Sequence, residues 1–244
     1  TLDRAKELGQ TAMAITDHGC MFGVIDFYEY ARSIGIKPIL GCEVYVAART
    51  RHDKDHALDA SSSHLILLAK NNIGYKNLMN IVSIGYIEGF YYKPRIDKKL
   101  LAEHHEGVIA SSACLGGEIA QHILHGRLDE ARKTALWYKE TFGEDYYLEI
   151  MLHPNSVSVG GQETYRKQLQ VAQEVIKMGQ ELDIKVIATN DTHFLNEEDA
   201  EAHDHLICMT TNSPISDPNR MRYTKQEWLK SPEEMTALFA DYPD

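Results

Sequence analysis

An aspartate and a histidine, two residues apart, follow a short apolar run in the last quarter of the chain. The run covers 185–188 and leads through Asn190 into Asp191 and His193. If the strand continues to His193, the two side chains point to the same face, because strand side chains alternate between faces. A carboxylate beside an imidazole at the end of a strand is half of a metal site or of an acid/base pair.

The same arrangement recurs near the N-terminus, and a third carboxylate lies inside an apolar segment. The apolar residues 14–16 lead directly into Asp17 and His18. Glu43 is flanked on both sides by apolar residues of the segment 38–47, so we expect it to be buried. A buried carboxylate must be paired, protonated or bound to a metal.

Two further residues with metal-binding side chains flank predicted strands. His64 opens a short apolar segment, and Cys114 follows the segment 109–113. Imidazole, carboxylate and thiol ligands together suit Zn²⁺, Mn²⁺ or Fe²⁺ rather than Mg²⁺ or Ca²⁺, which prefer oxygen. Several imidazoles mixed with carboxylates that can bridge ions suit a multinuclear site, which activates water and holds both oxygens of a phosphoryl displacement.

Several of these residues also have a purely structural explanation. Asp17 can cap the turn that follows it, and Glu43 can pair with a buried Arg or Lys. Cys114 taken alone fits a small core residue. His203 and His205 lie on an acidic helix, where a surface position is expected. The metal interpretation depends on the joint occurrence of these side chains at strand ends.

Strand-like and helix-like segments alternate along the chain and must position these residues. The expected strands are 11–16, 38–47, 64–69, 107–113, 146–151 and 185–188; the expected helices are 23–33, 73–86, 119–123, 129–141, 162–182, 197–208 and 231–240. The polar stretch 49–63 lacks periodicity and is predicted to be a loop. Strand–helix repeats predict parallel strands, hence an α/β barrel or distorted barrel with its chemistry at the C-terminal ends of the strands.

Composition narrows the function classes. The formal net charge of −11 argues against a general phosphate-binding surface, although it allows nucleic acid held through metal ions. No apolar stretch approaches the roughly 18 residues of a membrane span. The four cysteines are scattered, which fits free thiols in a cytosolic protein better than disulfides. The chain opens inside a helical pattern at Thr1, so we expect a fragment truncated at both ends.

Taken together, these motifs match a known family. The chain resembles the PHP (polymerase and histidinol phosphatase) domain of the bacterial replicative DNA polymerase III alpha subunit. The resemblance is carried by the segments 14–19, 37–45, 64–71, 112–118 and 188–193, and the segment 89–97 is typical of the polymerase branch. It implies an α/β fold, a distorted (β/α) barrel that is seven-stranded when complete. It also implies a centre of up to three divalent Zn, Mn or Fe ions.

Motif matching extends the resemblance to single residues. The implied metal ligands are His18, Glu43, His64, Cys114, Asp191 and His193. The implied catalytic residues are Asp191, His193 and Asp17. Lys93 and Arg95 are candidate phosphate contacts. The family also has a first strand carrying His-x-His, which the resemblance places before Thr1, so fewer ions, or none, are expected to bind this fragment.

The resemblance also implies a role for the parent protein. We expect 1–212 to form the barrel domain and 213–244 to be an extension or linker towards absent polymerase domains. The implied function is that of a cytoplasmic DNA-directed DNA polymerase in DNA replication, whose PHP domain is a candidate 3′–5′ exonuclease or phosphoesterase using metal-activated water. The implied partners are DNA, through the full-length polymerase, and other replicase subunits including a proofreading subunit, with no membrane.

Two alternatives remain open at the level of sequence. The domain can be a catalytically silent scaffold that stabilises the polymerase and binds a proofreading subunit. The second alternative is a stand-alone small-molecule phosphatase. The segment 89–97 and the linker-like tail argue against it.

Overall fold

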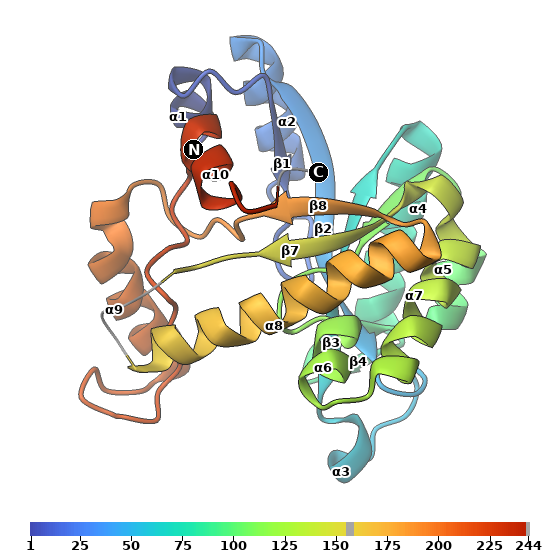
Figure 1. The fold of residues 1–244 in the computed structure, drawn as a ribbon. Coiled ribbons are helices and arrows are strands. Elements are labelled where there is room, and N and C mark those ends of the chain that lie inside the picture. Colours follow the sequence, from blue (N-terminus) through green and yellow to red (C-terminus); the bar gives the residue numbers. More distant parts are fainter. Residues whose placement is uncertain (155–158, 243–244) are drawn as a thin grey trace.

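The computed structural model describes residues 1–154 and 159–242, and within them a curled mixed sheet is surrounded by helices (Figure 1). The strands are β1 (Ala12–Ile15), β2 (Lys37–Ala47), β3 (Ser62–Ala69), β4 (Phe90–Tyr91), β5 (Lys93–Ile96), β6 (Val108–Ser111), β7 (Tyr146–Met151) and β8 (Lys185–Thr189). The α-helices are α1 (Leu2–Glu7), α2 (Val24–Ile34), α3 (His56–Asp59), α4 (Asn72–Ile87), α5 (Lys98–Glu103), α6 (Glu118–Leu124), α7 (Leu128–Phe142), α8 (Val159–Leu182), α9 (Ala200–Thr211) and α10 (Pro232–Leu238).

The sheet confirms the α/β prediction, but its strands are not all parallel. The strand order is β4-β5-β2-β3-β6-β7-β8, and β1 pairs with β2. β6, β7 and β8 are parallel to one another, whereas β3 is antiparallel to both of its neighbours and β4 is antiparallel to β5. The expectation of parallel pairing was wrong for β3, because the β2–β3 connection, residues 48–61, contains no helix longer than the single turn α3. The crossover between parallel strands is usually a helix that carries the chain back along the sheet.

The curled sheet is a distorted barrel that is open between β1 and β8. β1 is parallel to β2, and β8 runs in the same direction, since β3 is antiparallel to both β2 and β6. Residues of both strands line one cavity of about 730 Å³. Ile187 of β8 is 36% exposed, and Ala14 and Ala188 are exposed too. Apolar side chains on both sides of this opening are therefore uncovered.

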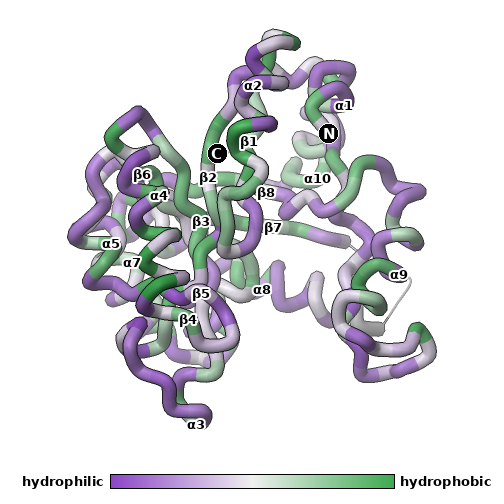
Figure 2. Tube along the Cα trace, turned by 180° about the vertical axis from the view of Figure 1, so that it is seen from behind, coloured by the Kyte–Doolittle hydropathy of each residue, from purple (hydrophilic) through white to green (hydrophobic). Residues whose placement is uncertain are grey.

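The hydrophobic core lies between the sheet and the helices α4 to α8. Leu65 and Leu67 of β3 and Leu148 of β7 are almost fully buried in it. Tyr138 of α7 stacks on Tyr146 of β7, with ring centroids 5.2 Å apart. Figure 2 shows the hydrophobic character of β1 and β2 against the hydrophilic loop around α3. The core fixes the sheet from one side and leaves its opposite face to the cavity.

The polar stretch 49–63, predicted to be a loop, contains the helical turn α3 and the start of β3. One buried side chain holds it: Arg95 of β5 is 1% exposed and donates to the carbonyl oxygens of four residues. The acceptors are Arg51, Asp53, Asp59 and Gly89, at 2.7 to 3.2 Å. The lack of periodicity in 49–63 correctly predicted that it forms no long helix or strand. It did not predict that the Arg95 guanidinium holds this segment.

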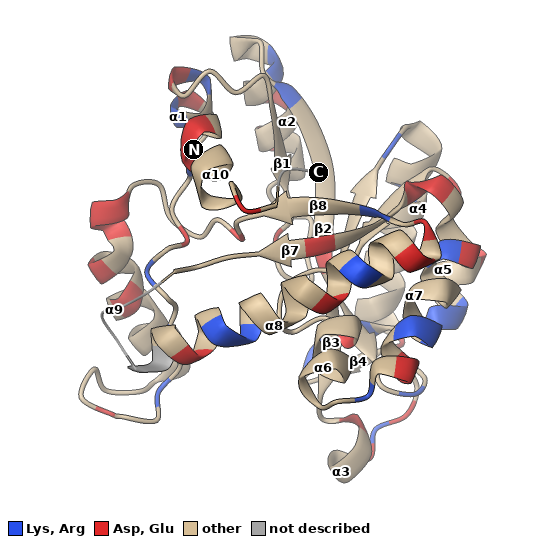
Figure 3. Ribbon diagram, viewed as in Figure 1, with Lys and Arg blue, Asp and Glu red and all other residues tan. Residues whose placement is uncertain are grey.

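Charged residues are distributed without a continuous basic face in the view of Figure 3, where acidic residues gather on α9. Among the helices that the structure describes, none combines the length and apolar character needed to cross a bilayer.

Candidate metal centre

Three donor side chains converge on one side of the sheet: His18 just after β1, Glu43 inside β2 and His64 near the start of β3. One donor atom each of His18, Glu43 and His64 lies within 4.8 Å of the other two. Nδ1 of His64 is 2.5 Å from Oε1 of Glu43, and Nδ1 of His18 is 3.6 Å from the same oxygen. Two imidazoles and one carboxylate thus surround a common point, as metal ligands do.

Strand direction explains how His64 reaches this edge. β3 is antiparallel to β2, so its beginning lies where the parallel strands end, and His64 pairs with Tyr45. His18 follows β1 and forms a parallel bridge with Glu43. Gly19 has φ +67 and donates its N–H to the carbonyl oxygen of Glu43 at 2.8 Å. This turn ends the strand and presents His18 to the carboxylate.

The surroundings of Glu43 fit a cation. Its side chain is 5% exposed, as predicted for a carboxylate in an apolar strand. In residues 1–154 and 159–242 it has no Lys or Arg ion-pair partner; the nitrogen atoms near its carboxylate are those of the His18 and His64 imidazoles. Oε1 of Glu43 and Nε2 of His193 are buried without a hydrogen bond of acceptable geometry in this part of the chain. A buried polar atom without a partner is costly, and a metal ion would satisfy both atoms.

Cys114 stands next to His64 on the other side. Its Sγ lies 3.6 Å from Nδ1 of His64 and accepts the N–H of Gly116 at 3.4 Å. Burial, together with the nearby carboxylates Asp191 and Glu43, raises the pKa of the Cys114 thiol to about 12. A divalent cation would reverse this effect, because it favours the thiolate. The position fits a metal ligand as well as it fits a small core residue.

Asp191 and His193 are brought together by a turn and not by a continuing strand. β8 ends at Thr189, and Asp191 has φ +50, so the premise that the strand extends to His193 was wrong. The turn still places Nε2 of His193 3.3 Å from Oδ1 of Asp191. Burial alone would raise the pKa of Asp191, but His193 and other nearby imidazoles hold it below its usual value. Burial alone would lower the pKa of His193, but the Asp191 carboxylate raises it.

The two halves of the site face each other across the cavity. The rings of His18 and His193 are stacked with centroids 5.9 Å apart. Six of the seven predicted metal ligands and catalytic residues line the 730 Å³ cavity, namely Asp17, His18, Glu43, Cys114, Asp191 and His193. His64 adjoins it through its contacts with Glu43 and Cys114. Asp17 is exposed, and its carbonyl oxygen accepts the N–H of Glu43 at 3.1 Å.

The predicted phosphate contacts differ in what they can reach. Lys93 is exposed, with Nζ 3.4 Å from the hydroxyl of Tyr45 and 4.8 Å from its ring centroid. The Tyr45 ring in turn contacts His64 and His18. Arg95 is buried, and its guanidinium is used on four carbonyl groups, so we do not propose it as a phosphate contact.

A segment near the C-terminus, 223–230, packs on the Asp191 turn. The carbonyl oxygen of Glu227 accepts the N–H of His193 at 2.8 Å, and the side chain of Asn190 donates to the carbonyl oxygen of Trp228 at 2.7 Å. The ring of Tyr223 lies 4.5 Å from that of His193. The sequence analysis predicted that these residues belong to an extension or linker. In the structure they pack against the barrel.

Sequence reasoning did not identify three side chains around the site. His203 was expected on a surface, but its ring lies 5.7 Å from that of His193. His153 is 3% exposed, and its Nε2 donates to the carbonyl oxygen of Asn190 at 2.9 Å. Glu149 is a second carboxylate inside an apolar strand. The pattern that pointed to Glu43 is also present around Glu149 and could have identified it.

Comparison with known proteins adds to this geometry. The family model described as "PHP domain" matches residues 1–153. The chain is 43% identical over 245 residues to the DNA polymerase III subunit alpha of Borreliella burgdorferi, covering 100% of this chain and 20% of that protein. It is 45% identical over 253 residues to the corresponding subunit of Campylobacter jejuni, covering 98% of this chain and 20% of that protein. The chain therefore spans about a fifth of the length of these relatives.

One solved structure, a protein from Bifidobacterium adolescentis assigned as a metal-dependent phosphoesterase, superposes with a TM-score of 0.43 at 13% identity. The superposition covers 100% of this chain and 90% of that one. A likeness of this size carries no argument about the site.

Proposed function

Because the chain belongs to the PHP domain family, we propose that it is a metal-dependent phosphoesterase module of a replicative DNA-directed DNA polymerase. The proposed reaction is hydrolysis of a phosphodiester by metal-activated water, with the 3′ end of a DNA strand as the substrate. The identity with DNA polymerase III alpha subunits over nearly the whole chain supports the polymerase context.

One observation carries the proposal: donor atoms of His18, Glu43 and His64 converge within 4.8 Å, and Oε1 of Glu43 is buried with no hydrogen bond of acceptable geometry among the residues that the structure describes. Apolar packing does not explain this arrangement, since a buried carboxylate is costly unless it is compensated, and the ion-pair neighbours of Glu43 in the described residues are two imidazoles without a Lys or Arg. We propose as metal ligands His18, Glu43, His64, Cys114, Asp191 and His193. Their mixture of imidazole, carboxylate and thiol fits Zn²⁺, Mn²⁺ or Fe²⁺.

The opening between β1 and β8 supports a larger centre in the intact protein. Both strands run in the same direction and expose apolar side chains such as Ala14 and Ile187 to the cavity. A parallel strand between them would pair with both and close the barrel. We propose that the His-x-His strand implied by the family occupies this position. Its two imidazoles would then join the cavity that already holds Asp191 and His18.

The chain's own residues have distinct parts in this proposal. Divalent ions bound here would activate water and neutralise charge on the phosphoryl oxygens. Asp191 remains ionised, since its pKa is held low, and we propose that it acts in catalysis with His193 and Asp17. The exposed Lys93 ammonium beside Tyr45 is proposed to contact a substrate phosphate. Tyr223 and His203 pack against His193 and restrict the directions in which its ring can turn.

The proposal is tested with the full-length protein and its Asp191→Asn variant. The two are compared on a 3′-labelled primer–template, after chelation and after readdition of Zn²⁺, Mn²⁺ or Fe²⁺. We expect metal-dependent 3′–5′ degradation by the wild type and a loss of at least about a hundredfold in the variant, as for other residues that act directly on a reaction. DNA synthesis by the same preparations should be unchanged, since other domains perform it.

The contrary outcomes are equally specific. Primer degradation that survives chelation would overturn the metal-dependent reaction. A variant with a lower melting temperature and unaltered nuclease activity would indicate a scaffold that stabilises the polymerase. DNA and the other replicase subunits are the partners that this proposal implies for the whole protein.

A further inference from the structure

Strand β7 lies between the two strands that lead into Cys114 and Asp191, yet it supplies none of the six proposed ligands. β7 pairs with β6 on one side and with β8 on the other. Its Glu149 is 6% exposed and lines the same cavity as the ligands. Burial raises the pKa of Glu149, and the hydrogen bonds that it accepts oppose this effect. A buried carboxylate at this place therefore needs an explanation.

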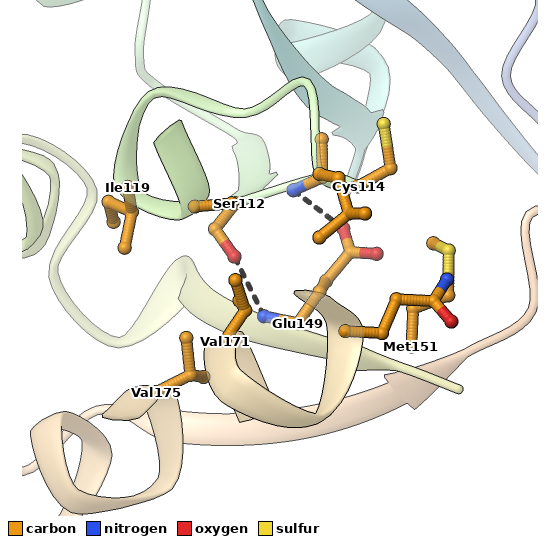
Figure 4. Close-up of a pocket in the computed structure, with 11 residues that line it drawn as sticks. Ser112, Cys114, Ile119, Glu149, Met151, Val171 and Val175 are labelled. Atoms are coloured by element: carbon orange, nitrogen blue, oxygen red, sulfur yellow. Dashed lines mark hydrogen bonds between the residues drawn. The ribbon is translucent and has the colours of Figure 1, made fainter. Parts of the chain in front are cut away.

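The two oxygens of Glu149 serve opposite neighbours. Oε1 accepts the hydroxyl of Ser111 and, at 3.2 Å, the N–H of Ala113, both on the β6 side. Oε2 accepts the hydroxyl of Thr189 on β8 at 2.8 Å. Figure 4 shows the Glu149 carboxylate beside Cys114, with the hydrogen bond to the backbone N–H that precedes Cys114 drawn as a dashed line. One side chain thus joins both ligand-bearing strands.

The turn that Glu149 contacts after β6 and the turn that follows its partner Thr189 each contain a non-glycine residue with positive φ. Ala113, the residue before Cys114, has φ +61, and Asp191, two residues after Thr189, has φ +50. A residue other than glycine rarely adopts this conformation, and it persists only when its surroundings hold it. The hydrogen bond to Ala113 holds the first turn directly. The hydrogen bond to Thr189 fixes the strand end from which the second turn starts.

Ion pairing does not explain the carboxylate. Within residues 1–154 and 159–242, Glu149 forms no salt bridge with Lys, Arg or His, and its described partners are two hydroxyls and one backbone N–H. A carboxylate suits this role because it accepts on both oxygens and donates to neither. A glutamine would offer one accepting oxygen, so it could hold one strand well but not both.

We propose that Glu149 is a positioning residue that holds the Cys114 turn and the Asp191 turn at the spacing that a shared metal centre requires. The inference rests on the proposed metal centre and adds to it a residue that binds no ion itself. Partners that orient metal ligands typically change metal affinity by about 10- to 100-fold when they are replaced. Glu149 differs from such a partner of a single ligand because it links two ligand-bearing strands.

The test is cobalt binding by the metal-free full-length protein, followed through the thiolate-to-Co²⁺ charge-transfer band. Subtraction of the Cys114→Ser spectrum isolates the band of this cysteine. We expect Glu149→Gln to weaken Co²⁺ binding about 10- to 100-fold and to shift the band. Thr189→Val has nearly the same shape as wild type and removes one link only, so a smaller effect in the same direction is expected.

Asp97→Asn is the matched control. Asp97 is also a buried carboxylate that accepts backbone and side-chain hydrogen bonds, but it holds Arg51 and the start of α5. We expect it to lower the melting temperature and to leave the Co²⁺ affinity and band unchanged. This separates positioning from a general loss of stability.

Three outcomes would count against the inference. Wild-type Co²⁺ affinity and band in both Glu149→Gln and Thr189→Val would overturn it and leave the proposed metal centre intact. Loss of one whole equivalent of Co²⁺ in Glu149→Gln, with Thr189→Val unaffected, would overturn it by showing that Glu149 is a ligand. A wild-type protein that takes up no Co²⁺ would overturn the proposed function and this inference together.

Discussion

Lys93 and Arg95 lie two residues apart on β5, but only Lys93 has a cationic group that a ligand can reach. The Lys93 side chain is exposed beside Tyr45, whose ring contacts His18 and His64. The Arg95 guanidinium is enclosed by carbonyl oxygens, so it stabilises the surrounding loop. At the scale of residues, the same charge is therefore accessible at Lys93, where we propose a binding role, and has a structural role at Arg95.

Replacement of Lys93 by alanine should weaken substrate binding and leave stability unchanged. A hydrogen bond to a charged group contributes about 1.5–3 kcal/mol, so KM for a 3′ primer end should rise roughly tenfold or more. The measurement is steady-state nuclease kinetics of the full-length protein with a thermal melt. Lys99→Ala, which removes an exposed lysine from α5, is the control. An unchanged KM in Lys93→Ala would remove Lys93 from the proposed site.

At the scale of elements, hydrophobic periodicity predicted most helices and strands but not how the strands pair. The expected strand 146–151 coincides with β7, and the expected helix 73–86 lies within α4. Periodicity depends on which side chains are buried, and a buried strand gives the same pattern whether it is parallel or antiparallel. The antiparallel direction of β3 was missed for this reason, although it determines where His64 lies.

For the candidate site, the sequence indicated which residue types could take part but not the backbone conformation or the long-range contacts that position them. Polar side chains beside apolar runs pointed to His18, His64, Cys114, Asp191 and His193, and Glu43 was noticed as a carboxylate inside an apolar strand. The family resemblance implied these six as metal ligands. The positive φ of Asp191 was not visible, since this conformation in a residue other than glycine is imposed by the surrounding structure. Contacts such as that of His153 with Asn190 join residues far apart in the chain and have no local signal.

Asp97 gives the start of α5 a stability that should depend on pH. Burial alone would raise the pKa of Asp97, but hydrogen bonds from Arg51 and Leu100 and the Arg51 charge hold it below its usual value. A carboxyl with a lowered folded-state pKa contributes fully above its unfolded value and loses its contribution as pH falls through the folded value. Stability from Asp97 is therefore present at neutral pH and is lost in acid, as pH falls through the lowered folded-state pKa.

The variant Asp97→Asn should show this dependence. We expect it to unfold with about 1–3 kcal/mol less free energy than wild type at pH 7, a difference that shrinks below about pH 4. Urea unfolding between pH 3 and pH 7 measures it. A difference that stays constant over that range would contradict the assigned cause.

At the scale of the whole molecule, the open barrel and the candidate metal centre are one feature. The cavity of about 730 Å³ extends from the exposed apolar residues of β1 and β8 to His18, Glu43 and Asp191. A strand inserted there would cover Ile187 and complete the sheet, and burying such a side chain contributes roughly 1.5–3 kcal/mol. Barrel closure and assembly of the complete metal centre are thus expected to occur together.

The central claim is that these side chains hold divalent metal, and locating the metal tests it most directly. Crystals of the full-length protein grown with Zn²⁺ would be measured at the zinc absorption edge, where anomalous scattering identifies the ion. The account predicts anomalous peaks in this cavity, about 2.0–2.3 Å from donor atoms of Glu43, His64 and Cys114 and of Asp191 and His193. Crystals that contain Zn²⁺ at other positions but show no peak at these residues would contradict it.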